Sequence, residues 1–392
     1  MYKLIELQSG VCASDGFFAD GISAGLKKEG AKDMAFIYSD TLCDIASVFT
    51  TNKMCAAPIK HFRAKGDFQT NFVMINSKNA NAMTGKAGIE DIEEVLASSG
   101  EQVINPVMSS TGVIGVRLPK QKIMEGMKLF DLSARNPHAA AQAIMTTDTF
   151  SKECAYKVEL EDGTFFHIGA MAKGAGMINP AMATMLCFIT TDAAVKKAEM
   201  QEILDEVTIT TFNAASVDGD TSTNDTVMLL SNAKSGVYHK EAFKEALHNI
   251  MLFLAKEMVR DGEGATKLVT YDVTGAKDNQ EAEIVAKALS NSLLVKTALF
   301  GEDPNWGRIA STVGASGVEA YEESLSISFD DLCVYKKGEL LFDEAMEKQA
   351  AAVMQKQSFT ISCDLGIAKG SFRAFGCDLG YEYVKINADY RT

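Results

Sequence analysis

The sequence Lys173-Gly-Ala-Gly-Met-Ile-Asn-Pro-Ala-Met-Ala-Thr184 is a polar loop with two glycines, and Met-Leu-Cys-Phe-Ile-Thr-Thr-Asp192 follows it as a short apolar run. Thr184 therefore stands where a loop meets a buried strand, with its hydroxyl beside the peptide bond from Ala183. A hydroxyl in that position can attack the preceding carbonyl, take the acyl group from nitrogen to oxygen, and leave an ester that water cleaves. The new N-terminal threonine then carries a nucleophile and an amine base on one residue. Taken alone, an ordinary threonine at a loop-to-strand junction explains the segment better, because strands favour threonine; the rest of the chain reverses that balance.

Length and composition are those of a globular enzyme. The 392 residues suggest two or three domains, and 47% hydrophobic with 23% charged residues is ordinary for such proteins. The net charge of −14 argues against binding to nucleic acid, whose phosphates it would repel. The eight cysteines have no zinc-ligand spacing and are interpreted as free thiols in a reducing compartment. With no signal peptide and no run of 18 apolar residues, we expect a cytoplasmic protein without a membrane span.

Short β-like runs alternate with amphipathic helical patterns, which indicates mixed α/β layers. The character of the strands changes after Ser324, and we place a domain boundary near Gly275–Asp278, giving domains 1–276 and 277–392. The expected strands are 34–38, 72–75, 157–160, 165–171, 185–190, 227–230, 268–273, 324–329, 358–363 and 371–375, and the expected helices are 89–98, 122–130, 137–145, 193–211, 240–259, 281–291 and 339–356.

A threonine nucleophile needs an oxyanion hole, which consists of donors aimed at the negative oxygen of a tetrahedral intermediate. The segment Ser109-Ser-Thr111-Gly112-Val-Ile-Gly115 is a candidate, because Gly112 lets the backbone approach a ligand closely. Thr111 would supply its hydroxyl and Gly112 its N–H. Taken alone, a glycine turn between a strand and a helix explains this segment better.

The amine freed at Thr184 is the better candidate base. An α-amine has a pKa of about 8, so about one-tenth is neutral at pH 7, whereas a lysine of pKa about 10.4 is neutral in only about one molecule in 2,500. We therefore expect Lys173 to stay cationic and to hold a carboxylate or polarise an amide, unless burial strongly lowers its pKa.

Three other segments have ordinary structural interpretations, and for two of them a functional interpretation stands beside it. The run Val217–Asp225 is rich in oxygen ligands, but an EF-hand loop starting at Asp218 would need glutamate where Leu229 stands, so we expect a turn that braces the nucleophile loop and no metal. Arg260–Gly264 closes a long helix with Gly262 as its C-terminal cap, and Glu263 beyond that cap could meet a substrate ammonium. Gly301–Arg308 is expected to be a structured turn.

Together these segments resemble the ornithine acetyltransferase family, which comprises bifunctional glutamate N-acetyltransferase/amino-acid acetyltransferases of arginine biosynthesis. The resemblance spans nearly the whole chain, and several long motifs occur in one order. They are Gly16-Phe17 with Gly21 and Gly25, Asn76–Ala82 with Thr84-Gly85, Ser110–Gly112, Thr146–Thr149, Lys173–Thr184, Val217–Asp225, Asp261–Gly264, Gly301–Arg308 and Asn387–Thr392.

The resemblance implies cleavage between Ala183 and Thr184 into an α chain of 1–183 and a β chain of 184–392, with two of each in the assembly. It implies a four-layer α/β/β/α sandwich with a smaller C-terminal α/β domain, and no cofactor. The implied acyl acceptor is Thr184, with Thr111 and Gly112 as the oxyanion hole. Implied substrate contacts come from Thr147, Lys173, Thr184, Glu263, Asn387 and Thr392.

The chain departs from the family pattern at three positions. Family members often have asparagine where Ala181 stands, glycine where Lys78 stands, and threonine where Ser216 stands. Ala181 is near the scissile bond and could slow cleavage. None of these departures removes a proposed catalytic group.

The predicted reaction is a ping-pong transfer of acetyl from N2-acetyl-L-ornithine to L-glutamate through a Thr184 ester. Use of acetyl-CoA as a further donor stays open. A second hypothesis is an N-terminal-nucleophile amidohydrolase or aminopeptidase, which would share the cleavage but need no acceptor amine. A third is a non-catalytic amino-acid-binding protein, which would keep an intact chain.

Overall fold

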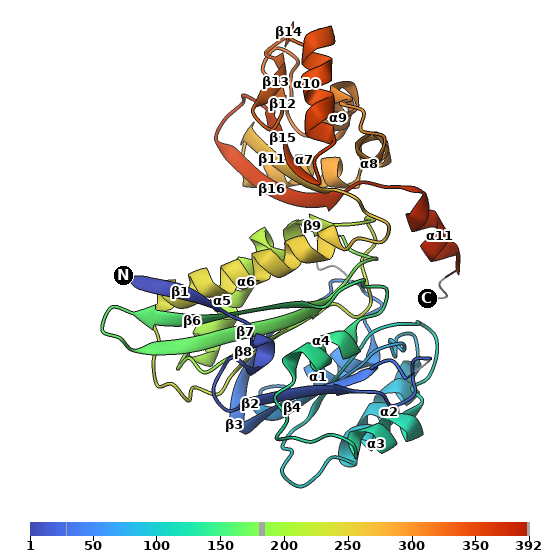
Figure 1. The fold of residues 1–392 in the computed structure, drawn as a ribbon, viewed down its shortest axis with the longest axis vertical. Helices are drawn as coiled ribbons and strands as arrows, with labels where there is room; N and C mark the ends of the chain where they lie inside the picture. Colours follow the sequence, from blue (N-terminus) through green and yellow to red (C-terminus); the bar gives the residue numbers. More distant parts are fainter. Residues whose placement is uncertain (29, 180–184, 390–392) are drawn as a thin grey trace.

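The computed structural model describes residues 1–28, 30–179 and 185–389. Ala181, Ala183, Thr184 and Thr392 therefore lie outside the described residues. The mixed α/β class expected from the sequence is confirmed, since the described strands form two sheets that helices cover (Figure 1).

The larger sheet has nine strands and contains the N-terminal half of the chain. Its order is β1-β6-β7-β8-β10-β3-β4-β5, with β2 paired to β3. Most neighbours are antiparallel, but β8 with β10 and β4 with β5 are parallel. The bounds are β1 Tyr2–Leu7, β2 Phe17–Ile22, β3 Met34–Phe49, β4 Thr70–Asn76, β5 Val107–Ser110, β6 Lys152–Leu160, β7 Phe165–Lys173, β8 Leu186–Thr191 and β10 Thr226–Ser231.

One long strand joins the two halves of this sheet. The first part of β3 pairs with β2 and β4, its last part (residues 44–49) pairs with β10, and its register with β4 shifts between Tyr38 and Cys43. The middle residues 40–42 are exposed. The half with β2, β4 and β5 can therefore lie against the half with β6, β7, β8 and β10.

Three apolar cores separate the layers. The first lies between the β6–β8/β10 half and the helices α5 (Lys197–Thr210) and α6 (Lys240–Arg260). The second lies between the two halves and includes α4 (Pro137–Ile144). The third lies between the β2–β5 half and α1 (Ala57–Ala64), α2 (Gly85–Ala97) and α3 (Lys120–Met127). Helices α2 and α3 thus lie outside the paired halves on one side and α5 and α6 on the other, whereas α4 lies between the halves (Figure 1).

The smaller sheet belongs mainly to the C-terminal part and has its own core. Its order is β14-β13-β12-β15-β11-β16-β9. Helix α11 (Tyr381–Asp389) extends from this part and buries none of its residues. The remaining bounds are β9 Ala215–Ser216, β11 Leu268–Ala276, β12 Ser326–Phe329, β13 Leu332–Lys336, β14 Glu339–Leu340, β15 Ser358–Asp364, β16 Gly370–Cys377, α7 Asn279–Asn291, α8 Leu293–Phe300, α9 Trp306–Ala315 and α10 Glu344–Met354, with 3-10 helices η1 Gly10–Cys12 and η2 Phe212–Ala214.

The division into domains 1–276 and 277–392 stays a prediction, and the sheets bear on where it falls. Strand β11 ends at residue 276, but it pairs with β15 and β16 inside the smaller sheet. A boundary that follows the sheets therefore precedes Leu268.

Each expected strand corresponds to an observed one, usually a longer one. Two expected helices begin too early: 193–211 is observed as α5 from Lys197, and 339–356 differs more. Residues 339–340 form β14, and α10 starts only at Glu344, because Asp343 caps it by accepting a hydrogen bond from the Met346 N–H at 2.8 Å. The expected turn 301–308 is likewise only partly a turn, since α9 begins at Trp306.

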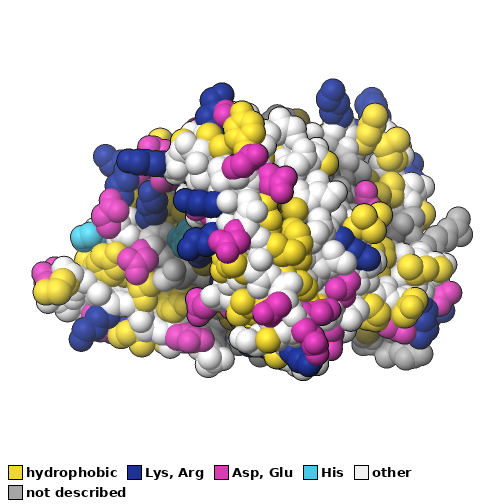
Figure 2. All heavy atoms as spheres, turned by 90° about the horizontal axis from the view of Figure 1, so that it is seen from above, with side chains coloured by type: hydrophobic (Ala, Val, Ile, Leu, Met, Phe, Trp, Pro, Cys, Tyr) yellow, Lys and Arg dark blue, Asp and Glu magenta, His cyan; other side chains and the backbone are white. Residues whose placement is uncertain are grey.

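The surface seen from the end of the smaller sheet mixes both signs of charge, with apolar side chains between them (Figure 2). Within the described ranges, no helix combines the length and the hydrophobicity that a membrane span requires.

Candidate active site

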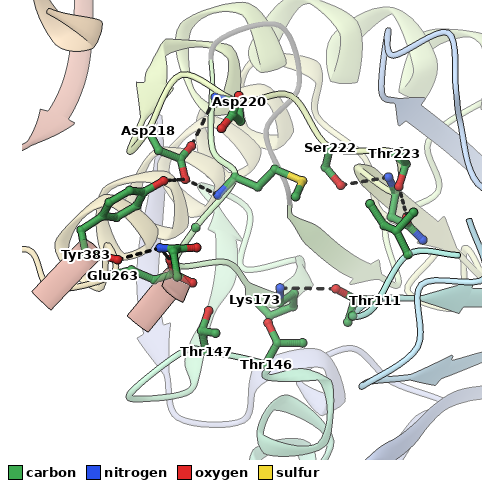
Figure 3. A pocket seen from close by; sticks show the side chains of 16 residues that line it. Thr111, Thr146, Thr147, Lys173, Asp218, Asp220, Ser222, Thr223, Glu263 and Tyr383 are labelled. Atoms are coloured by element: carbon green, nitrogen blue, oxygen red, sulfur yellow. Dashed lines mark hydrogen bonds between the residues drawn. The ribbon is translucent and has the colours of Figure 1, made fainter. Parts of the chain in front are cut away.

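Six of the predicted site residues line one cavity (Figure 3): Thr111, Gly112, Thr147, Lys173, Glu263 and Asn387. They come from the ends of β5, α4, β7 and α6, and from α11. The cavity measures about 200 Å³, against the roughly 10–15 Å³ that a single water needs on a comparable measure. It has room for a small molecule.

The Thr111–Gly112 segment leaves the end of β5 beside β4. Its path is fixed because the Thr111 N–H donates to the Asn76 carbonyl at 3.0 Å and the Val113 N–H to the Lys78 carbonyl at 3.1 Å. Between them, the Gly112 N–H has no acceptor among the described residues. Gly112 has φ +131°, and a Cβ there would lie 2.2 Å from the Lys78 carbonyl carbon, so only glycine fits.

The backbone at Lys78 shows why the family pattern often has glycine at this position. Its φ is +75°, which is a left-handed conformation that favours glycine. Glycine at this position would adopt the same backbone without strain.

Lys173 ends β7 and is buried beside the oxyanion candidates. Its ammonium donates to the Thr111 hydroxyl oxygen at 3.4 Å. Burial lowers the pKa of Lys173, while the negative charges of Asp148, Glu263 and Asp225 oppose that effect. The net result is a pKa below the ordinary value for lysine, so the Lys173 ammonium loses its proton more readily than an exposed one.

The 217–225 turn braces the chain on both sides of residues 180–184, as expected from the sequence. The Asp218 carboxylate accepts the N–H groups of Met177 and Ile178 at 2.5 and 2.8 Å. Asp225 accepts the N–H of Met185 at 3.0 Å. Burial raises the pKa of both carboxyl groups, and that of Asp225 lies well above its usual range.

Glu263 meets α11 at the opposite wall of the cavity. The Asn387 amide donates to the Glu263 carboxylate at 2.7 Å, and the Tyr383 hydroxyl donates to Asp218 at 3.2 Å. Gly176 makes room for Glu263, since a Cβ on Gly176 would lie 2.6 Å from its carboxylate.

The expected capping role of Gly262 needs a correction. Gly262 is not left-handed; Gly264 is, with φ +72°, and a Cβ there would lie 2.8 Å from both the Glu382 Cβ and the Tyr383 nitrogen. Gly264 therefore allows α11 to pack closely against the chain that follows α6.

Sequence reasoning missed two residues at this site. Tyr383 lines the cavity, but it belongs to a helix without buried residues and gave no signal. Asp148 lies within the Thr146–Thr149 motif, yet its partners Lys152 and Asp261 were not suspected. Cleavage at Ala183–Thr184 and the contact from Thr392 fall outside the described residues and stay predictions, as do the roles of the six cavity residues.

Comparison with known proteins identifies the family. The model of the ArgJ family matches residues 18–392. The chain belongs to the ArgJ family. A relative from Wolinella succinogenes, named arginine biosynthesis bifunctional protein ArgJ, is 61% identical over 396 residues, which cover 100% of both chains. One of the same name from Symbiobacterium thermophilum is 44% identical over 405 residues, covering 98% of this chain and 99% of its own.

Two solved ArgJ-family structures also match in part. The arginine biosynthesis bifunctional protein argJ from Bacillus halodurans is 41% identical and covers 52% of this chain and 98% of its own, with a TM-score of 0.49. The ornithine acetyltransferase complexed with ornithine from Mycobacterium tuberculosis is 32% identical and covers 47% of this chain and 100% of its own, with a TM-score of 0.38. ArgJ membership confirms the enzyme class expected from the resemblance, an acetyltransferase of arginine biosynthesis.

Proposed function

We propose that this chain cuts itself between Ala183 and Thr184 and then moves an acetyl group from N2-acetyl-L-ornithine to L-glutamate. The acetyl group would pass through an ester on the Thr184 hydroxyl. The proposal draws on the family, whose relatives are named for a bifunctional role in arginine biosynthesis.

The observation that carries the proposal is the relation between the cavity and the start of β8. Lys173 lines the cavity and pairs with Leu186 across β7 and β8. Asp225 holds the N–H of Met185. Thr184 is bonded to Met185, and consecutive Cα atoms lie about 3.8 Å apart. The described chain that leads into β8 therefore starts close to the cavity, which supports the proposed role of Thr184.

We assign the base to the amine that cleavage frees at Thr184. Its ordinary pKa of about 8 leaves a usable neutral fraction at pH 7. Burial lowers the pKa of Lys173 and the nearby carboxylates oppose that effect, and we propose that the protonated Lys173 holds a substrate carboxylate.

Thr111 and Gly112 are proposed to hold the oxyanion. The Gly112 N–H, which has no acceptor among the residues that the structure describes, and the Thr111 hydroxyl belong to neighbouring residues that line the cavity. A negative oxygen formed there would receive two donors, and loss of one such donor typically costs roughly 10²–10³ in rate.

Amino-acid recognition is assigned to the opposite wall. Glu263 would pair with a substrate ammonium, and Asn387, which already contacts Glu263, would orient it. Thr147 and Thr392 would add hydroxyl contacts. Acetylornithine and glutamate share an α-amino-acid frame, so one pocket can accept each in turn.

The reaction has two half-steps. The Thr184 oxygen attacks the acetamide carbonyl, the C–N bond breaks, and the ornithine amine leaves with the proton that the Thr184 amine took up. The glutamate amine then attacks the ester, and the threonine oxygen leaves as a hydroxyl. Transfer competes with hydrolysis, so the acceptor amine must be held in attack geometry and water excluded.

Substitution of Thr184 tests cleavage and transfer together. Thr184→Ala is expected to give one uncleaved, inactive 42.3 kDa chain, whereas Thr184→Ser keeps a hydroxyl and is expected to cleave and transfer. Intact-mass spectrometry and N-terminal sequencing check this, with mature wild-type protein yielding a chain that begins Thr-Met-Leu-Cys. A cleaved or active alanine variant would rule the scheme out.

Two substrate tests define the activity further. Turnover of acetylornithine that needs glutamate indicates a transferase, and turnover without glutamate would indicate the amidohydrolase alternative. Transfer from acetyl-CoA to glutamate would establish the second donor.

The proposal extends to the assembly and the location of the protein. Two α and two β chains follow from the family resemblance, and the mass of the native assembly tests that number. All eight cysteines are free thiols, as is usual in a reducing compartment, which supports the cytoplasm.

A further inference from the structure

A fully buried ammonium lies behind the cavity and takes no part in the mechanism above. Lys152 begins β6, and its side chain is 0% exposed. Its Nζ donates to Oδ1 of Asp148 at 2.8 Å, to Oδ2 of Asp261 at 2.5 Å and to the Phe150 carbonyl oxygen at 3.2 Å. An ammonium has three protons, so all of its donors are used.

The two carboxylates belong to segments that carry cavity residues. Asp148 follows Thr147 directly, and its Oδ1 also accepts the Gly174 N–H at 2.7 Å, next to Lys173. Asp261 accepts the Thr149 N–H at 3.0 Å and lies two residues before Glu263. One lysine thereby connects the segments of Thr147, Lys173 and Glu263.

A role in folding alone does not explain this arrangement. A buried ion pair is often no more stabilising than an apolar group of similar size, because desolvation of the charges offsets their attraction. Every segment that meets Lys152 here instead supplies a group to the cavity.

The same charges surround Lys173. Burial alone would raise the pKa of Asp148, but the positive charges of Lys173 and Lys152 bring it down to about 2. Besides burial, Lys152 lowers the pKa of Lys173, whereas Asp148, Glu263 and Asp225 raise it. Lys27 is a further cation within electrostatic reach of Lys173.

We propose that Lys152 is a positioning residue for the acetyl transfer: by binding Asp148 and Asp261 together, it fixes the segments of Thr147, Lys173 and Glu263 relative to one another. The inference rests on the proposed function, because it concerns how that reaction's substrate groups are held. Lys152 touches no substrate and acts through Asp148 and Asp261.

The test uses two substitutions that should shift the pKa of Lys173 in opposite directions. Lys152→Met removes a positive charge near Lys173, so the alkaline limb of kcat/KM for acetylornithine should move up by about 0.5–1 pH unit. Asp148→Asn removes the largest opposing negative charge, so the same limb should move down by about as much. In both variants KM for glutamate should rise several-fold. Rates are taken per mole of cleaved chain, measured by intact mass.

Lys296→Met is the matched control. Lys296 is also buried, but among the described residues its ammonium donates only to the Cys377 carbonyl and thiol in the smaller sheet. This variant should lose stability without moving the alkaline limb. The proposal is overturned if the alkaline limb of Lys152→Met stays at the wild-type pH. It is also overturned if that limb moves in the same direction as the limb of Asp148→Asn.

A second variant keeps the proposal testable if Lys152→Met does not fold. Asp261→Asn is isosteric and weakens the same link to Lys152, so it should raise KM for glutamate several-fold, as Asp148→Asn should; an unchanged KM in both variants overturns the inference. Absence of transfer by wild-type protein would instead contradict the proposed function.

Discussion

At Gly112 the backbone turns with φ +131° directly against the Lys78 carbonyl. No side chain fits there, and the N–H of this residue is left without a partner among the described residues. The same local geometry therefore excludes a Cβ and presents a donor to the cavity. Gly112 is thus needed both for the path of the backbone and for the N–H donor that we propose for the oxyanion.

Gly112→Ala should lower kcat by roughly 10²–10³, because the added carbon displaces the loop and misplaces the N–H donor. Steady-state rates of acetyl transfer measure this effect. Gly115→Ala is the matched control: Gly115 has φ +81° but open space around its Cβ position. It should show only the strain cost of about 1 kcal/mol in unfolding free energy, and equal rate losses in both variants would contradict the prediction.

At the scale of elements, α11 is attached to the site by a few contacts. It buries no residue of its own, and its links to the cavity are Tyr383 to Asp218 and Asn387 to Glu263. Asp218 in turn holds the Met177 and Ile178 N–H groups. The helix thereby connects the C-terminal part to the loop that precedes the predicted cut.

Tyr383→Phe should raise KM for glutamate about 3–10-fold with little change in kcat, because one hydrogen bond of about 1 kcal/mol holds the helix that carries Asn387. Tyr381→Phe serves as the control, since Tyr381 is on the same helix and is 83% exposed. Steady-state kinetics of both variants provide the measurement. A kcat loss in Tyr383→Phe with unchanged KM would go against this role for α11.

Many of the longer elements with a regular burial pattern were predicted from the sequence. Strands such as β4 and β10 are buried along their whole length, and α6 presents an apolar face at helical spacing. The predictions missed α11, which has no buried face, the two-residue strands β9 and β14, and several other short elements, namely β1, β2, β5, β13, α1, α8 and α9. The site motifs were local and therefore visible, whereas the Lys152–Asp261 contact joins residues 109 positions apart and leaves no local pattern.

At the scale of the whole molecule, β11 decides where the chain divides. Its side chains Val269, Tyr271 and Val273 lie in the core of the smaller sheet, between β15 and β16. A C-terminal piece without β11 would lack a central strand.

A fragment of residues 266–392 should therefore fold, and one of residues 277–392 should not, because loss of several large buried side chains costs about 2–5 kcal/mol each. Circular dichroism with thermal unfolding distinguishes the two. Cooperative unfolding of the 277–392 fragment would support the boundary at 276 instead.

The order of strands in the nine-stranded sheet has a consequence for a chain cut at residue 184. Strands β8 and β10 would belong to the second piece, yet they lie between β7 and β3 of the first. The two pieces would be interleaved and could not part without breaking the sheet on both sides. An uncut precursor regains this arrangement by a unimolecular process, but separated pieces must first meet by diffusion. After cleavage, recovery from denaturation would thus depend on protein concentration, whereas refolding of the uncut precursor would not.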